Sequence, residues 1–414
     1  MITFFTRPYR ALAVFLLMAE IAVPVFSQPE DVITSIRITG LKRTKHHTAE
    51  EPLRRFAGQE ASSIDADKVK AAIIDQGILE PLSVAIEEEA SSKTLVVEVR
   101  EKWTLFAIPI FFAGSNGISG GVAVFDANAF GLNHKIAASG MYQSEGWLAM
   151  AMYAALPGSP RHFGWGGSVF VSEGERRDSG PSNETLRRFN IRSIAARFSP
   201  QYQISNSLNA AFPVSYTNIA LLDTASPRRA PDSGAQFVQF GPEFSVRSTS
   251  WDGYLLSEKS AQMEYHLVLE IDSRLWHSLS FKGIYEKAIV PGFRMSFRGG
   301  ALYSPDVPPF LENGPSESGV NILPNSFSAR HYAGLSLGLE KYICRFSFGT
   351  ISILGAWQMV YSNGPILENR FDYGATGSLR FYMSRLAIPA VGLGIAYNIP
   401  EAYFQFSFSI GMAL

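Results

Sequence analysis

The chain has 414 residues, which is enough for two or three domains. Its 36 basic and 37 acidic residues nearly balance, so the charge gives no indication of nucleic-acid binding. Charged residues make up only 18% of the chain, below the usual share in a soluble domain, while aromatic residues make up 13%.

Residues 1–27 have the pattern of a secretory signal peptide. Arg7 and Arg10 precede an apolar run, and Val25-Phe26-Ser27 suits cleavage before Gln28. No other stretch offers 18 consecutive apolar residues, so no second helix that spans a bilayer is predicted. We expect an exported protein whose mature form has no transmembrane helix.

Residues 30–103 predict a small α+β domain. A strand is expected over 32–40, short helices over 48–56 and 65–76, and two further strands in PLSVAIEEE (81–89) and KTLVVEVRE (93–101). Ser63 or Asp65 can cap the second helix, and Gly77 can end it.

This order of elements, with Gly40, Gly58 and Gly77 between them, resembles a POTRA (polypeptide-transport-associated) domain. The resemblance implies that the second strand lies at a sheet edge and can pair with an extended client chain. The predicted client-binding edge is Pro81, Leu82, Ser83, Val84, Ala85 and Ile86, within 81–88. The alternative is that the domain is only a spacer or a docking point for a lipoprotein.

Residues 105–414 contain sixteen candidate strands, most of them ten or more residues long. Several alternate strictly, as in 260–271, where Met263, Tyr265 and Leu267 alternate with polar neighbours. In hydrocarbon a sheet must close, because every backbone polar group needs a partner. The pattern predicts a mainly β fold, a sixteen-stranded antiparallel transmembrane β-barrel behind the α+β domain. A soluble β-sandwich is the rival, but its strands would be shorter.

The predicted connections fall into two classes. Those on the side where the chain enters the first strand are tight, as at 129–133 and 290–292, with 251–257 as a longer exception. Those on the other side are long and polar, as at 173–189 and 306–328. This asymmetry is typical of outer-membrane barrels, whose periplasmic turns are short.

The whole of 31–414 resembles the outer-membrane protein assembly superfamily (BamA/TamA-type, bacterial surface antigen). FDANAFG (125–131) is similar to a turn of that family through Asp126, Asn128, Phe130 and Gly131. GLSLGLEKY (334–342) and GATGSLRFY (374–382) are similar to two of its strands. The alternation turns Glu340 and Arg380 toward the barrel lumen, where they either pair with each other or are solvated separately.

The resemblance also implies that the longest loop, 306–328, folds back into the barrel. Family members carry an Arg-Gly pair at the tip of this loop, and the Arg contacts an acidic residue on a nearby strand. The corresponding stretch, 322–327, has neither residue, and SILGAWQMVYSNG (352–364) lacks the acid. Arg330, predicted to lie on the following strand, is the candidate substitute in the lumen.

The last strand, AYFQFSFSIGMAL (402–414), has one apolar face and one polar or small face. The apolar face carries Phe404, Phe406, Phe408, Ile410 and Leu414, and we expect it to meet lipid. The resemblance implies a seam between this strand and 105–114 that can part to admit a client strand.

The function implied by the resemblance is assistance in the insertion or translocation of client proteins at the bacterial outer membrane, with the α+β domain in the periplasm. Expected partners are the lipid bilayer, protein clients and periplasmic lipoproteins or chaperones. The alternatives are a surface antigen or channel that keeps only the scaffold, and a transporter dedicated to one partner protein. No motif predicts a metal, a cofactor or an enzyme, and the single cysteine, Cys344, excludes an intrachain disulfide.

Overall fold

The computed structural model describes residues 31–89, 92–114, 117–157, 161–224, 231–252, 255–271, 274–346, 349–364, 368–383 and 389–410. The predicted signal peptide and Leu414 lie outside these residues. The chain forms two compact units, one containing Ala49–Glu101 with the residues up to Lys42, the other Arg43–Thr48 with Lys102–Leu414. Within the described ranges, no helix is long and apolar enough to cross a membrane.

The first unit is a three-stranded sheet with short helices. Its elements are β1 (Ile33–Thr39), a 3-10 turn (Glu51–Phe56), α3 (Ala66–Asp75), β2 (Leu79–Glu89) and β3 (Ser92–Glu101), while α2 (His46–Glu50) begins in the second unit and ends in the first. Asp65 begins α3 by accepting a hydrogen bond from the Asp67 backbone N–H at 2.9 Å. Val69 and Ile73 of this helix are fully buried, as are Leu95 and Val97 of β3. The helix stripe and the sheet face therefore form one core.

Strand β3 lies at the centre of this sheet, in the order β1-β3-β2. It runs parallel to β1 and antiparallel to β2. Strand β2 is therefore an edge strand, and it contains the whole predicted client-binding edge.

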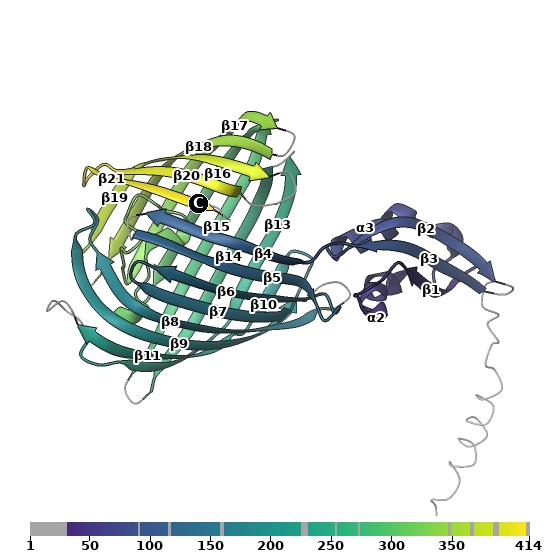
Figure 1. Ribbon diagram of the computed structural model, residues 1–414, viewed down its shortest axis with the longest axis horizontal. Coiled ribbons are helices and arrows are strands. Elements are labelled where there is room, and N and C mark those ends of the chain that lie inside the picture. Colours follow the sequence, from purple (N-terminus) through teal and green to yellow (C-terminus); the bar gives the residue numbers. More distant parts are fainter. Residues whose placement is uncertain are drawn as a thin grey trace, which may run out of the picture. The chain divides into compact units, whose positions relative to one another are not determined.

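The second unit is a closed antiparallel barrel (Figure 1). Its strands are β4 (Leu105–Gly114), β5 (Gly117–Ala129), β6 (His134–Gln143), β7 (Gly146–Ala155), β8 (Phe163–Ser179), β9 (Thr185–Gln203), β10 (Leu208–Ala211), β11 (Val214–Thr224), β12 (Ala235–Phe240), β13 (Glu243–Asp252), β14 (Leu255–Glu270), β15 (Leu275–Val290), β16 (Phe293–Tyr303), β17 (His331–Phe346), β18 (Gly349–Asn363), β19 (Arg370–Met383), β20 (Pro389–Asn398) and β21 (Tyr403–Ile410). Closure excludes the sandwich.

The barrel has sixteen spans, because β10 with β11 and β12 with β13 each share one position in the wall. Both β10 and β11 pair with β9, and both β12 and β13 pair with β14. The sequence pattern predicted two unbroken strands here, which is wrong. Pro213 and Pro242 lie at the two interruptions, where the missing N–H cannot continue a ladder.

Two predicted loops are shorter than expected. The stretch 173–189 is mostly strand, because the β8–β9 ladder continues to Ser179 and Thr185. The long turn predicted at 251–257 is also wrong, since Asp252 of β13 already pairs with Leu255 of β14. At 173–189 polar side chains predicted a loop, although a barrel strand that continues beyond the bilayer needs no apolar face.

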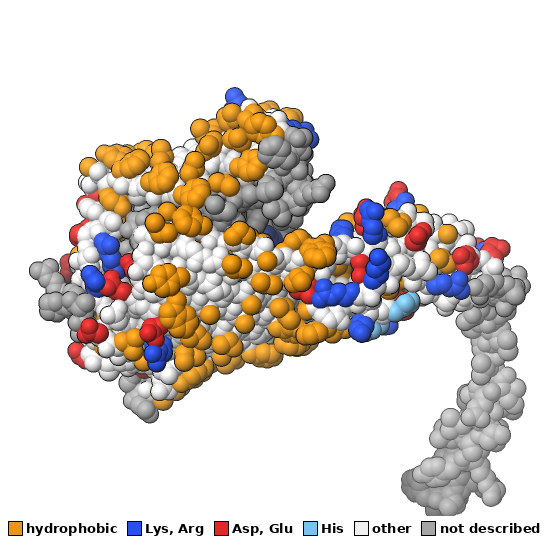
Figure 2. Space-filling view, viewed as in Figure 1, with side chains coloured by type: hydrophobic (Ala, Val, Ile, Leu, Met, Phe, Trp, Pro, Cys, Tyr) orange, Lys and Arg blue, Asp and Glu red, His pale blue; other side chains and the backbone are white. Residues whose placement is uncertain are grey.

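The barrel wall is apolar outside and polar inside. In β16, Met295 and Phe297 are exposed, while Arg294 and Ser296, which alternate with them, are buried. Figure 2 shows hydrophobic side chains across the visible face of the barrel. This arrangement reverses that of a soluble sheet and is the one required when lipid surrounds the wall.

Candidate functional site

The barrel closes through a short contact between β4 and β21, called here the seam. Within the described residues its ladder has three pairs, Phe408 with Ala113, Ser409 with Phe112 and Ile410 with Phe111. The neighbouring ladders β20–β21 and β4–β5 have eight and ten pairs. The Phe111 and Phe408 rings add an edge contact, with centroids 5.8 Å apart. The seam therefore has the shortest backbone pairing of these three ladders.

A cavity of about 350 Å³ lies at the seam, lined by Ala113, Gly117, Ile118 and residues 403–406. A second cavity of about 250 Å³ is lined by Phe112, Asn325, Ser407 and Phe408, among others. The start of β21 is thus bordered by open space on the side that faces β4.

The apolar face of the last strand lies as predicted where it is described. Phe404 and Phe406 are exposed on the outer wall, and Phe408 is half-buried beside Phe111. Ile410 pairs with Phe111 in the seam ladder, whereas Leu414 lies outside the described residues. Gln405, on the other face, points inward and contacts the loop described next.

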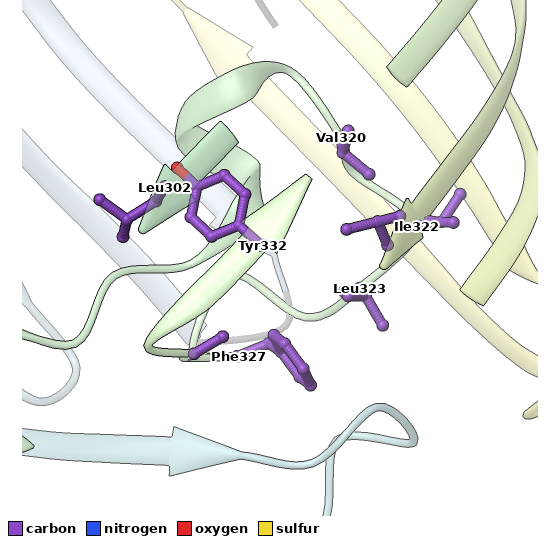
Figure 3. Close-up of a cluster of buried hydrophobic side chains, with 8 residues drawn as sticks. Leu302, Val320, Ile322, Leu323, Phe327 and Tyr332 are labelled. Atoms are coloured by element: carbon purple, nitrogen blue, oxygen red, sulfur yellow. The ribbon is translucent and has the colours of Figure 1, made fainter. Parts of the chain in front are cut away.

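The long loop between β16 and β17, residues 304–330, is called here the plug loop. It contains two 3-10 turns, Pro309–Leu311 and Pro315–Ser318. Its apolar side chains join inward-facing side chains of the wall in one buried cluster (Figure 3), formed by Leu302, Val320, Ile322, Leu323, Phe327, Ala329, Tyr332 and Val360. The loop therefore folds into the barrel lumen, as the resemblance implied.

Hydrogen bonds fix the plug loop to two strands of the wall. Gln358 of β18 donates to the Gly319 carbonyl at 3.0 Å and accepts from the Asn321 backbone N–H at 2.7 Å. Gln405 of β21 donates from its side-chain amide to the carbonyls of Asn321 and Leu323, the latter at 3.2 Å.

A buried ionic cluster fixes the other end of the plug loop. Glu312 of the loop accepts from Arg187 of β9 at 2.6 Å, and Arg187 also donates to Asp178 of β8 at 2.5 Å. Arg187 and Glu312 are each 1% exposed. Here the loop supplies the acid and the wall supplies the guanidinium, which is the reverse of the family pattern. The sequence shows that Glu312 is a carboxylate in the predicted loop, but it does not show which residue pairs with it.

Arg330 does not replace the loop arginine with which family members contact the barrel wall. It lies at the end of the plug loop, one residue before β17, and is half-buried. Its Nε atom lies 3.4 Å from Glu312 of the same loop. Arg330 therefore joins the ionic cluster around Glu312.

Glu340 and Arg380 lie in a second buried cluster in the lumen. Arg380 Nη1 is 3.8 Å from Glu340 Oε2, so the two charges lie within ion-pair distance. Arg294 of β16 donates to Glu340 and, at 2.9 Å, to Glu286 of β15. Tyr382 also donates to Glu340, at 2.9 Å. Charge pairing of this kind is what makes buried carboxylates tolerable.

The strongest partner of Glu340, Arg294, was not predicted from the sequence. Arg294, Ser296 and Arg298 alternate with Phe293, Met295 and Phe297, so a period-two reading of FRMSFR would have placed both arginines in the lumen. Their partners depend on the register between strands, which the alternation does not contain.

The family-like turn after β5 holds the segment Arg43–Lys45, which belongs to the barrel unit. Asp126 accepts hydrogen bonds from Arg43 and Thr104, and Asn128 donates to Thr44 at 2.9 Å. Gly131 has φ +73°, and a Cβ there would lie 2.2 Å from the Arg43 carbonyl oxygen. Gly131 is therefore required by the close approach of this segment, whereas Phe130 is exposed.

Edge strand β2 carries exposed apolar side chains. Leu82 and Ile86 are among the exposed large hydrophobic residues of the first unit. Pro81 and Val84 are half-buried, and Ser83 and Ala85 are exposed. The predicted client-binding residues thus form an accessible strand.

One cluster in the barrel combines types of side chain that bind metals. Glu243, Glu264 and His266 have ligand atoms within 4.8 Å of one another. Glu243 is already paired with Arg197 at 2.5 Å and with His266 at 3.2 Å. Because a guanidinium neutralises this carboxylate, we assign no metal to the cluster.

The chain is similar in fold to solved outer-membrane barrels. BamA from Haemophilus ducreyi lacking POTRA domains 1-3 has a TM-score of 0.64 at 14% identity over 92% of this chain and 84% of that chain. CdiB from Acinetobacter baumannii has a TM-score of 0.67 at 12% identity over 92% and 74%. CdiB from Escherichia coli has a TM-score of 0.64 at 12% identity over 92% and 76%.

No protein-family model matches the sequence, and no curated protein sequence matches it either. The chain thus has the fold of the BamA and CdiB outer-membrane barrels, as the resemblance predicted. At these identities the likeness establishes the fold.

Proposed function

We propose that this protein resides in the bacterial outer membrane and assists the insertion or translocation of client proteins, without catalysing a reaction of its own. The observation that carries the proposal is the seam, which has three ladder pairs within the described residues. At a net 0.5–1.5 kcal/mol for each hydrogen bond, parting these described pairs costs about 2–5 kcal/mol. A barrel normally has no free edge, and here one forms by parting fewer described pairs than at either neighbouring ladder.

The first unit fits the role of a POTRA-like domain in the periplasm. Its sheet order leaves β2 at an edge, and exposed Leu82 and Ile86 provide apolar positions for a second strand. The alignments with BamA and CdiB cover 92% of the chain, which is more than the barrel unit alone. In this proposal a client strand pairs first with β2 and later with the seam.

Conditional depletion with quantitative outer-membrane proteomics tests the proposed function. We expect the abundance of several other outer-membrane β-barrels to fall, with their unfolded forms accumulating in the periplasm. A fall confined to one exported protein would favour the dedicated transporter. Unchanged abundance and folding of every other outer-membrane protein would contradict both.

The plug loop argues against a constitutively open channel. Its buried cluster and its bonds to Gln358 and Gln405 occupy the lumen. We expect the intact protein to conduct weakly in a planar bilayer and a variant lacking 306–328 to conduct several-fold more, because the lumen is then filled by water. Large, steady conductance that does not change on loop removal would support a porin-like role instead.

A further inference from the structure

The beginning of β21 is held differently on its two sides. On one side Tyr403–Ser407 pair with β20 from Asn398 to Gly394. On the other side, the described ladder with β4 starts only at Phe408. The seam cavity borders the same stretch, residues 403–406. Among the described residues, backbone pairing therefore secures this half of the strand toward β20.

Gln405 ties this half of β21 to the plug loop. Its amide donates to two loop carbonyls, those of Asn321 and Leu323. The loop is in turn held by the β8–β9 hairpin, since the Ser179 backbone N–H donates to the Ser326 carbonyl at 2.9 Å and Ser328 donates to Asp178 at 3.1 Å. The plug loop thus connects the last strand with a hairpin on the other side of the seam.

Glu401 makes a second connection to the same hairpin. It lies in the turn before β21 and accepts from Ser182, in the turn between β8 and β9, at 2.7 Å. Arg370 of β19 donates to its other oxygen at 2.7 Å. These hydrogen bonds from Arg370 and Ser182 lower the pKa of Glu401, so the acceptor is ionised at neutral pH. Strands β4–β7 lie between the two turns in the barrel order, so this bond bridges the seam.

We propose that Gln405 and Glu401 form a latch that keeps the extracellular half of the seam closed, and that displacement of the plug loop and the β8–β9 hairpin releases β21. The latch rests on the proposed function, because it regulates the same seam. In the latch, side-chain hydrogen bonds take the place of backbone hydrogen bonds of a ladder. Side-chain hydrogen bonds can break and re-form without separating a whole pair of strands. A client or a partner that moves the loop therefore opens the seam at one end first.

Two thiols across the seam report its opening. Ala113→Cys and Phe408→Cys place two thiols at directly opposed positions, in a Cys344→Ser background that removes the native exposed cysteine. In lipid vesicles without oxidant, modification of these opposed thiols by a water-soluble maleimide reports the open fraction of the seam, and we expect Gln405→Leu to speed it about fivefold, the effect of losing one or two hydrogen bonds. Glu401→Ala, in a turn outside the strands, is expected to speed it as well, and the double variant most.

The matched control is Gln239→Leu on β12, which lies on the far side of the barrel from the seam. It introduces the same change of side chain and should leave the rate unchanged. If Gln405→Leu and Glu401→Ala are both modified only as fast as the parent, the latch is wrong. This measurement needs no client, so it can fail while depletion still supports the proposed function, and the reverse also holds.

Discussion

Replacing Glu340 by leucine is expected to destabilise the folded barrel by about 3–5 kcal/mol, because it breaks a buried ion pair from one side only. The Glu340 side chain is 1% exposed and lies between Arg294 and Arg380. Without it, Arg294 and Arg380 both lose their ion pair with this carboxylate, while Glu286 pairs with Arg294 and Arg298. An unpaired buried guanidinium is among the most costly groups in a protein interior.

Unfolding by urea in lipid vesicles, monitored through the heat-dependent shift in gel migration, measures this loss of stability. The matched control is Glu173→Gln, which breaks an ion pair of the same barrel with Arg192 at 2.6 Å. That pair is exposed, with side chains 34% and 54% accessible, so its loss should cost less than about 1 kcal/mol. Equal losses in the two variants would show that the lumen cluster is as well solvated as the surface. The Glu340→Leu, Arg380→Met double variant should recover part of the stability.

Converting Leu82 and Ile86 of β2 to glutamate is expected to lower the abundance of client barrels nearly as far as depletion does. Both side chains are exposed, so the change should leave the first unit folded. It places two charges where a pairing client strand would set apolar side chains, and it removes the contacts that accompany β-augmentation. Quantitative outer-membrane proteomics of cells that carry only this variant measures the effect.

The control for the edge is Ile74→Glu. Ile74 is also an exposed apolar residue of the first unit, but it lies on α3 and not on β2. We expect cells with Ile74→Glu to match the parent. If the Leu82 and Ile86 variant also matched the parent, β2 would not recruit clients, and the domain would be a spacer or a docking point for a lipoprotein.

Much of the barrel can be predicted from alternation, because the order of apolar and polar residues within a strand indicates which of its faces is apolar. Alternation predicts strands over 105–114, 134–145, 276–289 and 293–304, which agree closely with the bounds of β4, β6, β15 and β16. The errors fall where the alternation stops being informative. At Ser179 and Thr185 the strands continue beyond lipid with polar residues on both faces, and at Pro213 and Pro242 a local break does not disturb the pattern on either side.

The candidate site was predicted less completely. Glu340, Arg380 and Gln405 could be placed on the polar face of their strands, since a period of two decides the face. Arg294, Arg187 and Glu312 could not be paired in advance. Their contacts join strands or loops that are 8 to 125 residues apart in the chain.

The sequence by itself determined the class of this protein: a small α+β unit followed by a barrel of sixteen spans whose last strand presents phenylalanines to lipid. These properties are local, because each depends on the order of polar and apolar residues within one element. Only the tertiary structure decided that the seam has three described pairs, that the plug loop supplies the acid in its contact with the wall, and that Gln405 and Glu401 hold β21. Those facts depend on register and closure, which bring distant residues together and leave no trace in the pattern of a single strand.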